Sequence, residues 1–148
     1  MYVRELYVTY GLRWLGGCRL PTHPLVCPAD TAQIFHSLFG LEAVELCGML
    51  CVSTTRRPLR YHLLSRGTLD SACVHPREVF RTALLANASG IVLGHNHPSG
   101  DPRPSAEDKQ LTARLIQAGQ VVGVDLLDHI VIGERDRYWS FREHGQLR

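Results

Sequence analysis

The feature that most constrains the fold is a short, uninterrupted apolar run, Gly-Ile-Val-Leu-Gly at residues 90–94, that leads directly into a loop. A run of this kind has no polar face, so it is typical of a central strand that other layers cover on both sides. The loop that follows, residues 95–104, contains three prolines and must leave the sheet. The chain is therefore expected to fold around a sheet with helices packed against it.

Composition limits the class of protein further. The 148 residues match one domain, and 45% apolar with 20% charged residues is typical of a globular protein. Sixteen basic and fourteen acidic residues give a net charge of +2, which is too small to indicate nucleic-acid binding. No apolar stretch could span a membrane, and the charged N-terminus does not resemble a signal peptide. The five cysteines form no C-x-x-C pair, which argues against a disulfide framework or a thiolate zinc site and favours the cytoplasm.

Local patterns predict alternating helices and strands. The expected helices are one that is capped by Asp30-Thr31 and stops at Gly40, one at residues 76–88 and one at residues 105–119. The expected strands are a hairpin of residues 44–52 and 59–64, then 90–94, 121–133 and 138–141. Together these predict an α/β or α+β domain of three layers with a mixed sheet. Residues 1–28 are expected to form an N-terminal strand and a loop arm.

The segment that carries chemical information runs from His95 to Asp108. His95 and His97 lie two residues apart where the buried strand ends, so extended geometry points both imidazoles the same way, with Cα atoms about 6.5–7 Å apart. The loop then turns, and the next helix can bring Asp108 back over the strand end. Two neutral imidazoles and one carboxylate are a catalytic zinc set, because three protein ligands leave the fourth position for water.

Several residues in this region have a second interpretation. Ser105 and Asp108 also satisfy a plain helix start, in which the serine caps the helix and the aspartate complements its dipole. The two interpretations are compatible, since a capped helix start aims a carboxylate rigidly. Asp101 is a competing third ligand, although Asp-Pro in such a loop is typical of an ordinary turn. Asp128 and His129, inside an apolar run, either support the ligands or form a satisfied polar pair near a strand bulge.

The pattern H-x-H-x7-S-x2-D at residues 95–108 resembles the JAMM motif of the JAB/MPN zinc metalloprotease family. The segments HNHPSGDPRPSAED, LLDHIVIG and SRGTLDSACVHPREVF resemble its RadC-like branch, and the resemblance covers roughly residues 29–148. It implies a cytidine-deaminase-like α/β fold in which His95, His97 and Asp108 hold zinc.

The resemblance also implies a general base on an earlier strand. Glu45 matches that position, with Glu42 as the alternate. The base would take a proton from water and deliver it to the leaving amine, and the Ser105 hydroxyl would stabilise the oxyanion. The expected reaction is hydrolysis of a peptide or isopeptide bond in a protein or peptide substrate, with a ubiquitin-like modifier as one such substrate.

Other functions predict different features. A non-catalytic interaction module of the MPN type would usually lack ligands that this sequence keeps. A DNA-repair factor, suggested by the RadC name, predicts a basic stripe that a charge of +2 does not supply. A zinc nucleobase deaminase would need H-x-E and P-C-x-x-C, and neither is present.

Overall fold

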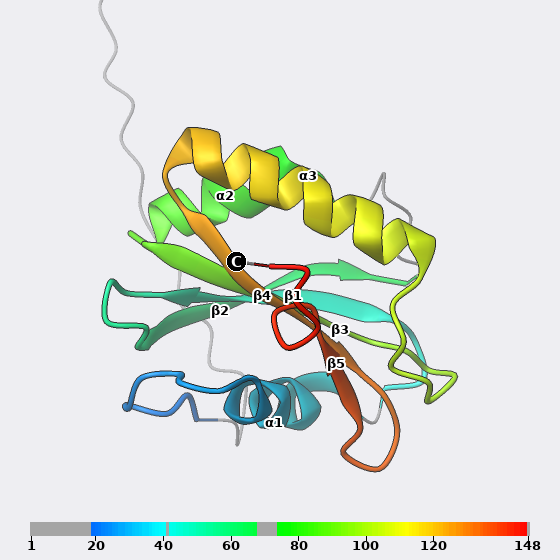
Figure 1. Cartoon of the computed structure of the whole chain (residues 1–148). Helices are drawn as coiled ribbons and strands as arrows, with labels where there is room; N and C mark the ends of the chain where they lie inside the picture. The colour runs from blue at the N-terminus through cyan, green and yellow to red at the C-terminus, as the bar shows by residue number, and fades with distance from the viewer. Residues whose placement is uncertain (1–18, 41, 68–73, 148) are drawn as a thin grey trace, which may run out of the picture.

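The protein is built on one mixed sheet, seen in a computed structural model that describes residues 19–40, 42–67 and 74–147. Its strands are β1 (Leu46–Val52), β2 (Pro58–Arg66), β3 (Gly90–Asn96), β4 (Asp125–Ile132) and β5 (Tyr138–Ser140). They lie in the order β2-β1-β3-β4-β5 (Figure 1). β3 pairs in parallel with β4, and the other neighbouring strands pair antiparallel. The sheet is therefore mixed, as expected.

Helices cover both faces of the sheet. α1 (Pro28–Phe39) lies on one face, and α2 (Pro76–Leu85) and α3 (Ala106–Val122) lie on the other (Figure 1). The three layers confirm the predicted α/β class. β3 lies in the middle of the sheet with every residue buried, which is the environment that its apolar run predicted.

Close packing of α1 against β3 depends on Gly94. A Cβ atom at this position would lie 2.5 Å from ring atoms of Phe35, which is fully buried in α1. The absence of a side chain therefore lets the helix approach the strand. Because successive side chains alternate between faces, His95 points to the α3 side and Asn96 to the α1 side.

The predicted end of α3 was wrong. The helix continues past Gly119 and ends at Gly123, whose φ of 80° closes it in the left-handed conformation. Gly119 lies inside the helix, and a Cβ there would lie 2.5 Å from the carbonyl oxygen of Val124, in the turn that ends the helix, and 3.3 Å from the ring of Phe80 in α2. The first residues of the predicted strand 121–133 are thus helical, and β4 begins at Asp125.

The predicted start of α1 was also wrong. The helix begins at Pro28, before the expected cap at Asp30, because proline tolerates the first turn, where an N–H would have no partner. The remaining elements differ from prediction by a few residues at their ends. The strand expected near the N-terminus lies outside the described residues. Within the described ranges, no helix is both long and apolar enough to cross a membrane.

Candidate metal centre

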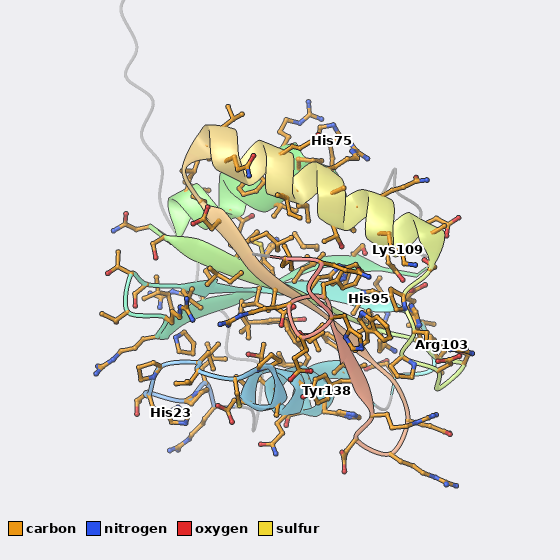
Figure 2. All side chains as sticks on the ribbon, viewed as in Figure 1. His23, His75, His95, Arg103, Lys109 and Tyr138 are labelled. Atoms are coloured by element: carbon orange, nitrogen blue, oxygen red, sulfur yellow. The ribbon has the colours of Figure 1, made fainter. Side chains whose placement is uncertain are left out.

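The candidate site lies at the end of β3, where the chain leaves the sheet. His95 is fully buried, and Figure 2 shows it on the side of the molecule where the loop to α3 emerges. His97 follows just after the strand and is less buried. The Nε2 atoms of the two imidazoles lie 3.0 Å apart. The strand end therefore directs two imidazole nitrogens, each a possible metal ligand, at one point.

Asp108 approaches the same point from the first turn of α3. Its Oδ1 lies 3.1 Å from Nε2 of His95, and its Oδ2 lies 3.3 Å from Nε2 of His97. A capping box holds this carboxylate: the Ser105 backbone N–H donates to Oδ2 (2.7 Å), and the Asp108 N–H donates to Ser105 Oγ (3.1 Å). The helix cap thus fixes the direction of the carboxylate.

The electrostatics of this cluster favour an ionised carboxylate. Burial alone would raise the pKa of Asp108, but hydrogen bonds with His95 and His97 outweigh it and hold the pKa well below its ordinary value. Burial lowers the pKa of His97, yet its hydrogen bonds with Asp108 and the Asp101 carbonyl raise it above its ordinary value overall. The cluster therefore carries negative charge that attracts a proton or a cation.

Glu45 lies further from the two imidazoles than Asp108 does. It immediately precedes β1, and its Oε1 is 4.0 Å from Nε2 of His95 and 3.9 Å from Nε2 of His97. The ligand atoms of Glu45, His95 and His97 all lie within 4.8 Å of one another, so this group could hold a metal ion. The structure thus brings Glu45 to the site.

The segment that carries Glu45 is held in place by Asn96. The side-chain amide of Asn96 donates to the carbonyl oxygens of Val44 (3.1 Å) and Glu42 (3.3 Å), and its Oδ1 accepts from the Leu46 N–H (2.7 Å). Asn96 itself is buried. The residue between the two histidines therefore braces the backbone on both sides of Glu45, a role that the sequence analysis did not assign.

Each histidine also has a partner for its other ring nitrogen. Nδ1 of His97 lies 2.8 Å from the carbonyl oxygen of Asp101, which can only accept, so Nδ1 carries a proton and Nε2 is the atom directed at Asp108. Nδ1 of His95 lies 2.8 Å from Nε2 of His129, on the neighbouring strand β4. Nδ1 of His129 lies 2.7 Å from Oγ1 of Thr112 in α3.

His129 is buried and held tightly. Its ring stacks on Phe141 with the centroids 4.9 Å apart and the planes within 8°. Burial, with the nearby His95 ring, holds the pKa of His129 well below its ordinary value. Of the two interpretations of this residue, the geometry favours support of a ligand. Thr112 was not predicted to belong to the site, because only its spacing from Asp108 along one helix links it to the motif.

The comparisons with known proteins agree with this geometry. A model of the RadC-like JAB domain matches residues 25–146. The chain belongs to the RadC-like JAB domain family. A UPF0758 protein of Thermotoga maritima is 50% identical over 103 residues, covering 70% of this chain and 46% of that protein. A UPF0758 protein of Rubrobacter xylanophilus is 39% identical over 136 residues, covering 91% of this chain and 59% of that protein. The chain thus spans about half the length of these relatives.

The competing acidic residues lie elsewhere in this JAB domain. The Asp101 carboxylate forms a close pair with Arg103 in the exposed loop, with contacts of 2.6–3.1 Å, and this pairing lowers the pKa of Asp101 to about 2. Glu42 points to Arg66, with Oε2 3.4 Å from its guanidinium. Asp128 accepts hydrogen bonds from the hydroxyl of Ser140 (2.6 Å) and from the Arg142 N–H (3.0 Å). It is therefore a satisfied polar residue beside a register shift of the sheet.

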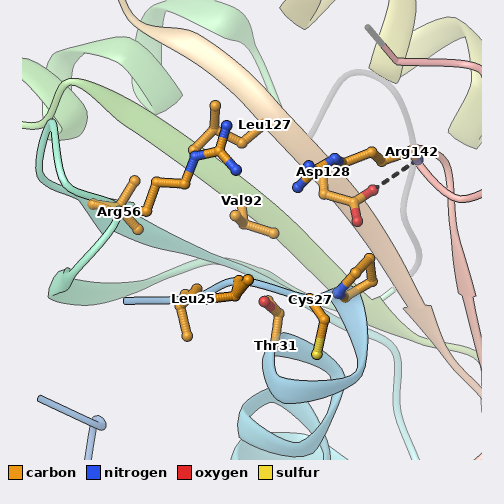
Figure 3. Close-up of a pocket in the computed structure, with 11 residues that line it drawn as sticks. Leu25, Cys27, Thr31, Arg56, Val92, Leu127, Asp128 and Arg142 are labelled. Carbon is orange, nitrogen blue, oxygen red and sulfur yellow. Dashed lines mark hydrogen bonds between the residues drawn. The ribbon is translucent and has the colours of Figure 1, made fainter. Parts of the chain in front are cut away.

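Two hollows differ in their relation to the site. An open pocket of about 450 Å³ lies over the cluster, and it is lined by Glu45, His97, Pro98, Ser99, Ser105, Glu107 and Asp108. A second hollow, of about 20 Å³, lies between α1 and the sheet beside Asp128 and Arg142 (Figure 3). The second has room for about one water molecule. The first can therefore admit a substrate to the cluster.

Proposed function

We propose that this JAB domain is a zinc-dependent hydrolase that cleaves a peptide or isopeptide bond. One observation carries the proposal: two imidazole nitrogens and the Asp108 carboxylate converge within 3.3 Å, while Glu45 stands back at 3.9–4.0 Å beside an open pocket. In this arrangement His95, His97 and Asp108 are the metal ligands and Glu45 is the general base.

The donor set fits zinc. Ligand atoms bound tetrahedrally at about 2.0–2.1 Å lie roughly 3.3–3.4 Å apart, close to the separations among His95, His97 and Asp108. Glu45 lies further away, as expected of a residue that contacts a water molecule rather than the ion. A zinc ion held by these three residues would supply Lewis acidity, which lowers the pKa of a bound water towards about 7.

Side chains of the protein would transfer the proton and stabilise the oxyanion. Glu45 accepts the proton of the attacking water and delivers it to the leaving amine. Ser105 uses its Oγ as the acceptor in the helix cap, so its hydroxyl proton is free to be donated into the pocket. That proton can stabilise the oxyanion that forms on the substrate carbonyl. The Glu45 carboxylate and the Ser105 hydroxyl thus line one pocket, where a bound zinc ion would polarise the substrate carbonyl.

The substrate partner in this proposal is a protein or peptide. The open shape of the pocket suits an extended chain, such as the tail of a ubiquitin-like modifier joined to another protein. The buried free thiols of Cys47 and Cys51 suit the reducing cytoplasm.

The test is hydrolysis by zinc-loaded protein of a peptide library and of model substrates joined through a lysine side chain. In H₂¹⁸O, mass spectrometry should find one ¹⁸O in each new carboxylate. Glu45→Gln should lower kcat by about 10²–10⁴-fold, the usual contribution of a general base, with zinc content unchanged. Glu42→Gln is the matched control and should keep full activity. A fully active Glu45→Gln variant would contradict the assignment of the base.

A further inference from the structure

A chain of hydrogen bonds runs behind the cluster, from α3 through β4 to His95. Thr112 Oγ1 lies 2.7 Å from the Asp108 carbonyl oxygen and 2.7 Å from Nδ1 of His129. Nε2 of His129 in turn lies 2.8 Å from Nδ1 of His95. Thr112 and His129 are both buried, so water does not compete for these bonds. The chain therefore connects two of the proposed ligands through protein groups.

The protons in this chain can be placed by elimination. A carbonyl oxygen only accepts, so the single hydroxyl proton of Thr112 points to the Asp108 carbonyl. The Thr112 oxygen is then an acceptor for His129, whose Nδ1 must carry the proton. Nε2 of His129, on the other side of the ring, lies 2.8 Å from Nδ1 of His95, so the bond from Thr112 orients the ring that contacts His95.

We propose that Thr112 and His129 are positioning residues that hold the His95 ring with its Nε2 directed at Asp108 and His97. This inference rests on the proposed function, because a metal ligand must keep its binding atom directed at the ion. The opposite order of protons would put two acceptors, Thr112 Oγ1 and the Asp108 carbonyl, 2.7 Å apart without a hydrogen between them.

The two histidines are thus oriented by different means. His97 is fixed by a backbone carbonyl, that of Asp101, which no side-chain substitution removes. His95 depends on side chains, so its orientation can be tested by substitution. Phe141, stacked on His129, holds the plane of the intermediate ring.

The variant Thr112→Val keeps the branched shape and removes the hydroxyl, whereas Thr112→Ser keeps the hydroxyl. Thr82→Val is a matched control, because Thr82 makes the same bond to a carbonyl four residues earlier, that of Glu78, in α2 and away from the site. Each variant is compared with the unaltered protein by circular dichroism to confirm that it folds.

The first readout is the set of histidine ring signals in ¹⁵N-labelled protein stripped of metal by a chelator. In Thr112→Val the signals of His129 and His95 should both shift, because the ring that contacts His95 has lost its hydrogen bond to the hydroxyl. Thr112→Ser and Thr82→Val should match the unaltered protein. Unchanged His95 signals in Thr112→Val would overturn the inference.

The second readout is zinc affinity, measured by competition with a chromophoric chelator. Thr112→Val should bind zinc about 10–100-fold more weakly, the usual effect of losing a residue that orients a ligand. Thr112→Ser and Thr82→Val should stay close to the unaltered protein. Equal affinity in Thr112→Val and Thr82→Val would overturn the inference. Neither readout uses hydrolysis, so a protein that orients His95 as described yet cleaves no substrate would contradict the proposed function alone.

Discussion

Ser105 has two separate tasks at the start of α3, and they can be distinguished. Its backbone N–H holds the Asp108 carboxylate, whereas its Oγ accepts the Asp108 N–H and leaves the hydroxyl proton free. Removing the side chain therefore spares the bond that aims the carboxylate. Removal would delete the cap acceptor and the donor proposed for the oxyanion.

We expect Ser105→Ala to lower kcat by about 10²–10³-fold, as for other lost oxyanion donors, with zinc affinity nearly unchanged. Loss of the cap should also lower the free energy of unfolding by about 1 kcal/mol. Substrate turnover, chelator competition and urea unfolding measure the three effects. Ser105→Thr keeps a hydroxyl and should recover most of both losses. A large loss of zinc affinity in Ser105→Ala would show that the side chain, not the backbone, aims Asp108.

Among the elements, the contact between the end of β3 and the start of β1 is the one that places Glu45. Asn96 makes this contact with three hydrogen bonds to the backbone of residues 42–46. The Glu45 carbonyl oxygen also accepts from the Gly67 N–H (2.8 Å), so Asn96 and the chain just after β2 hold this segment together. The sequence pattern H-x-H gives no reason to single out the middle residue, because its partner lies about fifty positions earlier in the chain.

We predict that Asn96→Ala lowers the free energy of unfolding by about 1–3 kcal/mol, because buried backbone groups lose their partners. Hydrogen exchange of the Leu46 amide should become faster, since its acceptor is Asn96 Oδ1. Urea unfolding and exchange measured by NMR test both effects. Gln33→Ala, at an exposed position of α1, is the control and should leave exchange at Leu46 unchanged. Slow exchange at Leu46 in Asn96→Ala would contradict the role of Asn96 in holding the backbone around Glu45.

For the whole molecule, a rise in pH above the unfolded pKa of His97 should lower the stability of the metal-free fold and strengthen the binding of zinc. Without metal, the lowered pKa of Asp108 stabilises the fold above its unfolded value of 3.8, and this contribution is lost as pH falls. The raised pKa of His97 stabilises the fold below its unfolded value of 6.5, and this contribution is lost as pH rises through the folded value. The pair therefore contributes most between these two values.

Zinc must displace the proton of His97, so its affinity should rise with pH and level off above the folded pKa of that residue. Below this pKa, we expect affinity to fall about tenfold per pH unit for each proton displaced. Competition titrations between about pH 5 and 8 test the slope. Thermal unfolding with and without excess zinc should show a stabilisation that grows over the same range. A pH-independent affinity would contradict the role of His97 as a ligand.

The sequence by itself determined the three layers of the fold and the convergence of His95, His97 and Asp108 on one point. An apolar run with no polar face must lie inside a sheet, and the two-residue period of a strand points His95 and His97 the same way. A serine cap three residues before Asp108 aims its carboxylate, as the structure shows. These are local effects, set by residues close together in the chain.

The tertiary structure decided what surrounds that motif. Asn96 braces Glu45, and Thr112 and His129 meet His95, only because distant strands and a helix pack together. The end of α3 was mispredicted because Gly119 lies inside the helix, where a Cβ would approach the ring of Phe80 in α2 to 3.3 Å, and Gly123 ends the helix instead. Hydrogen bonds between segments far apart in sequence leave no periodic pattern, so the packed fold alone could reveal them.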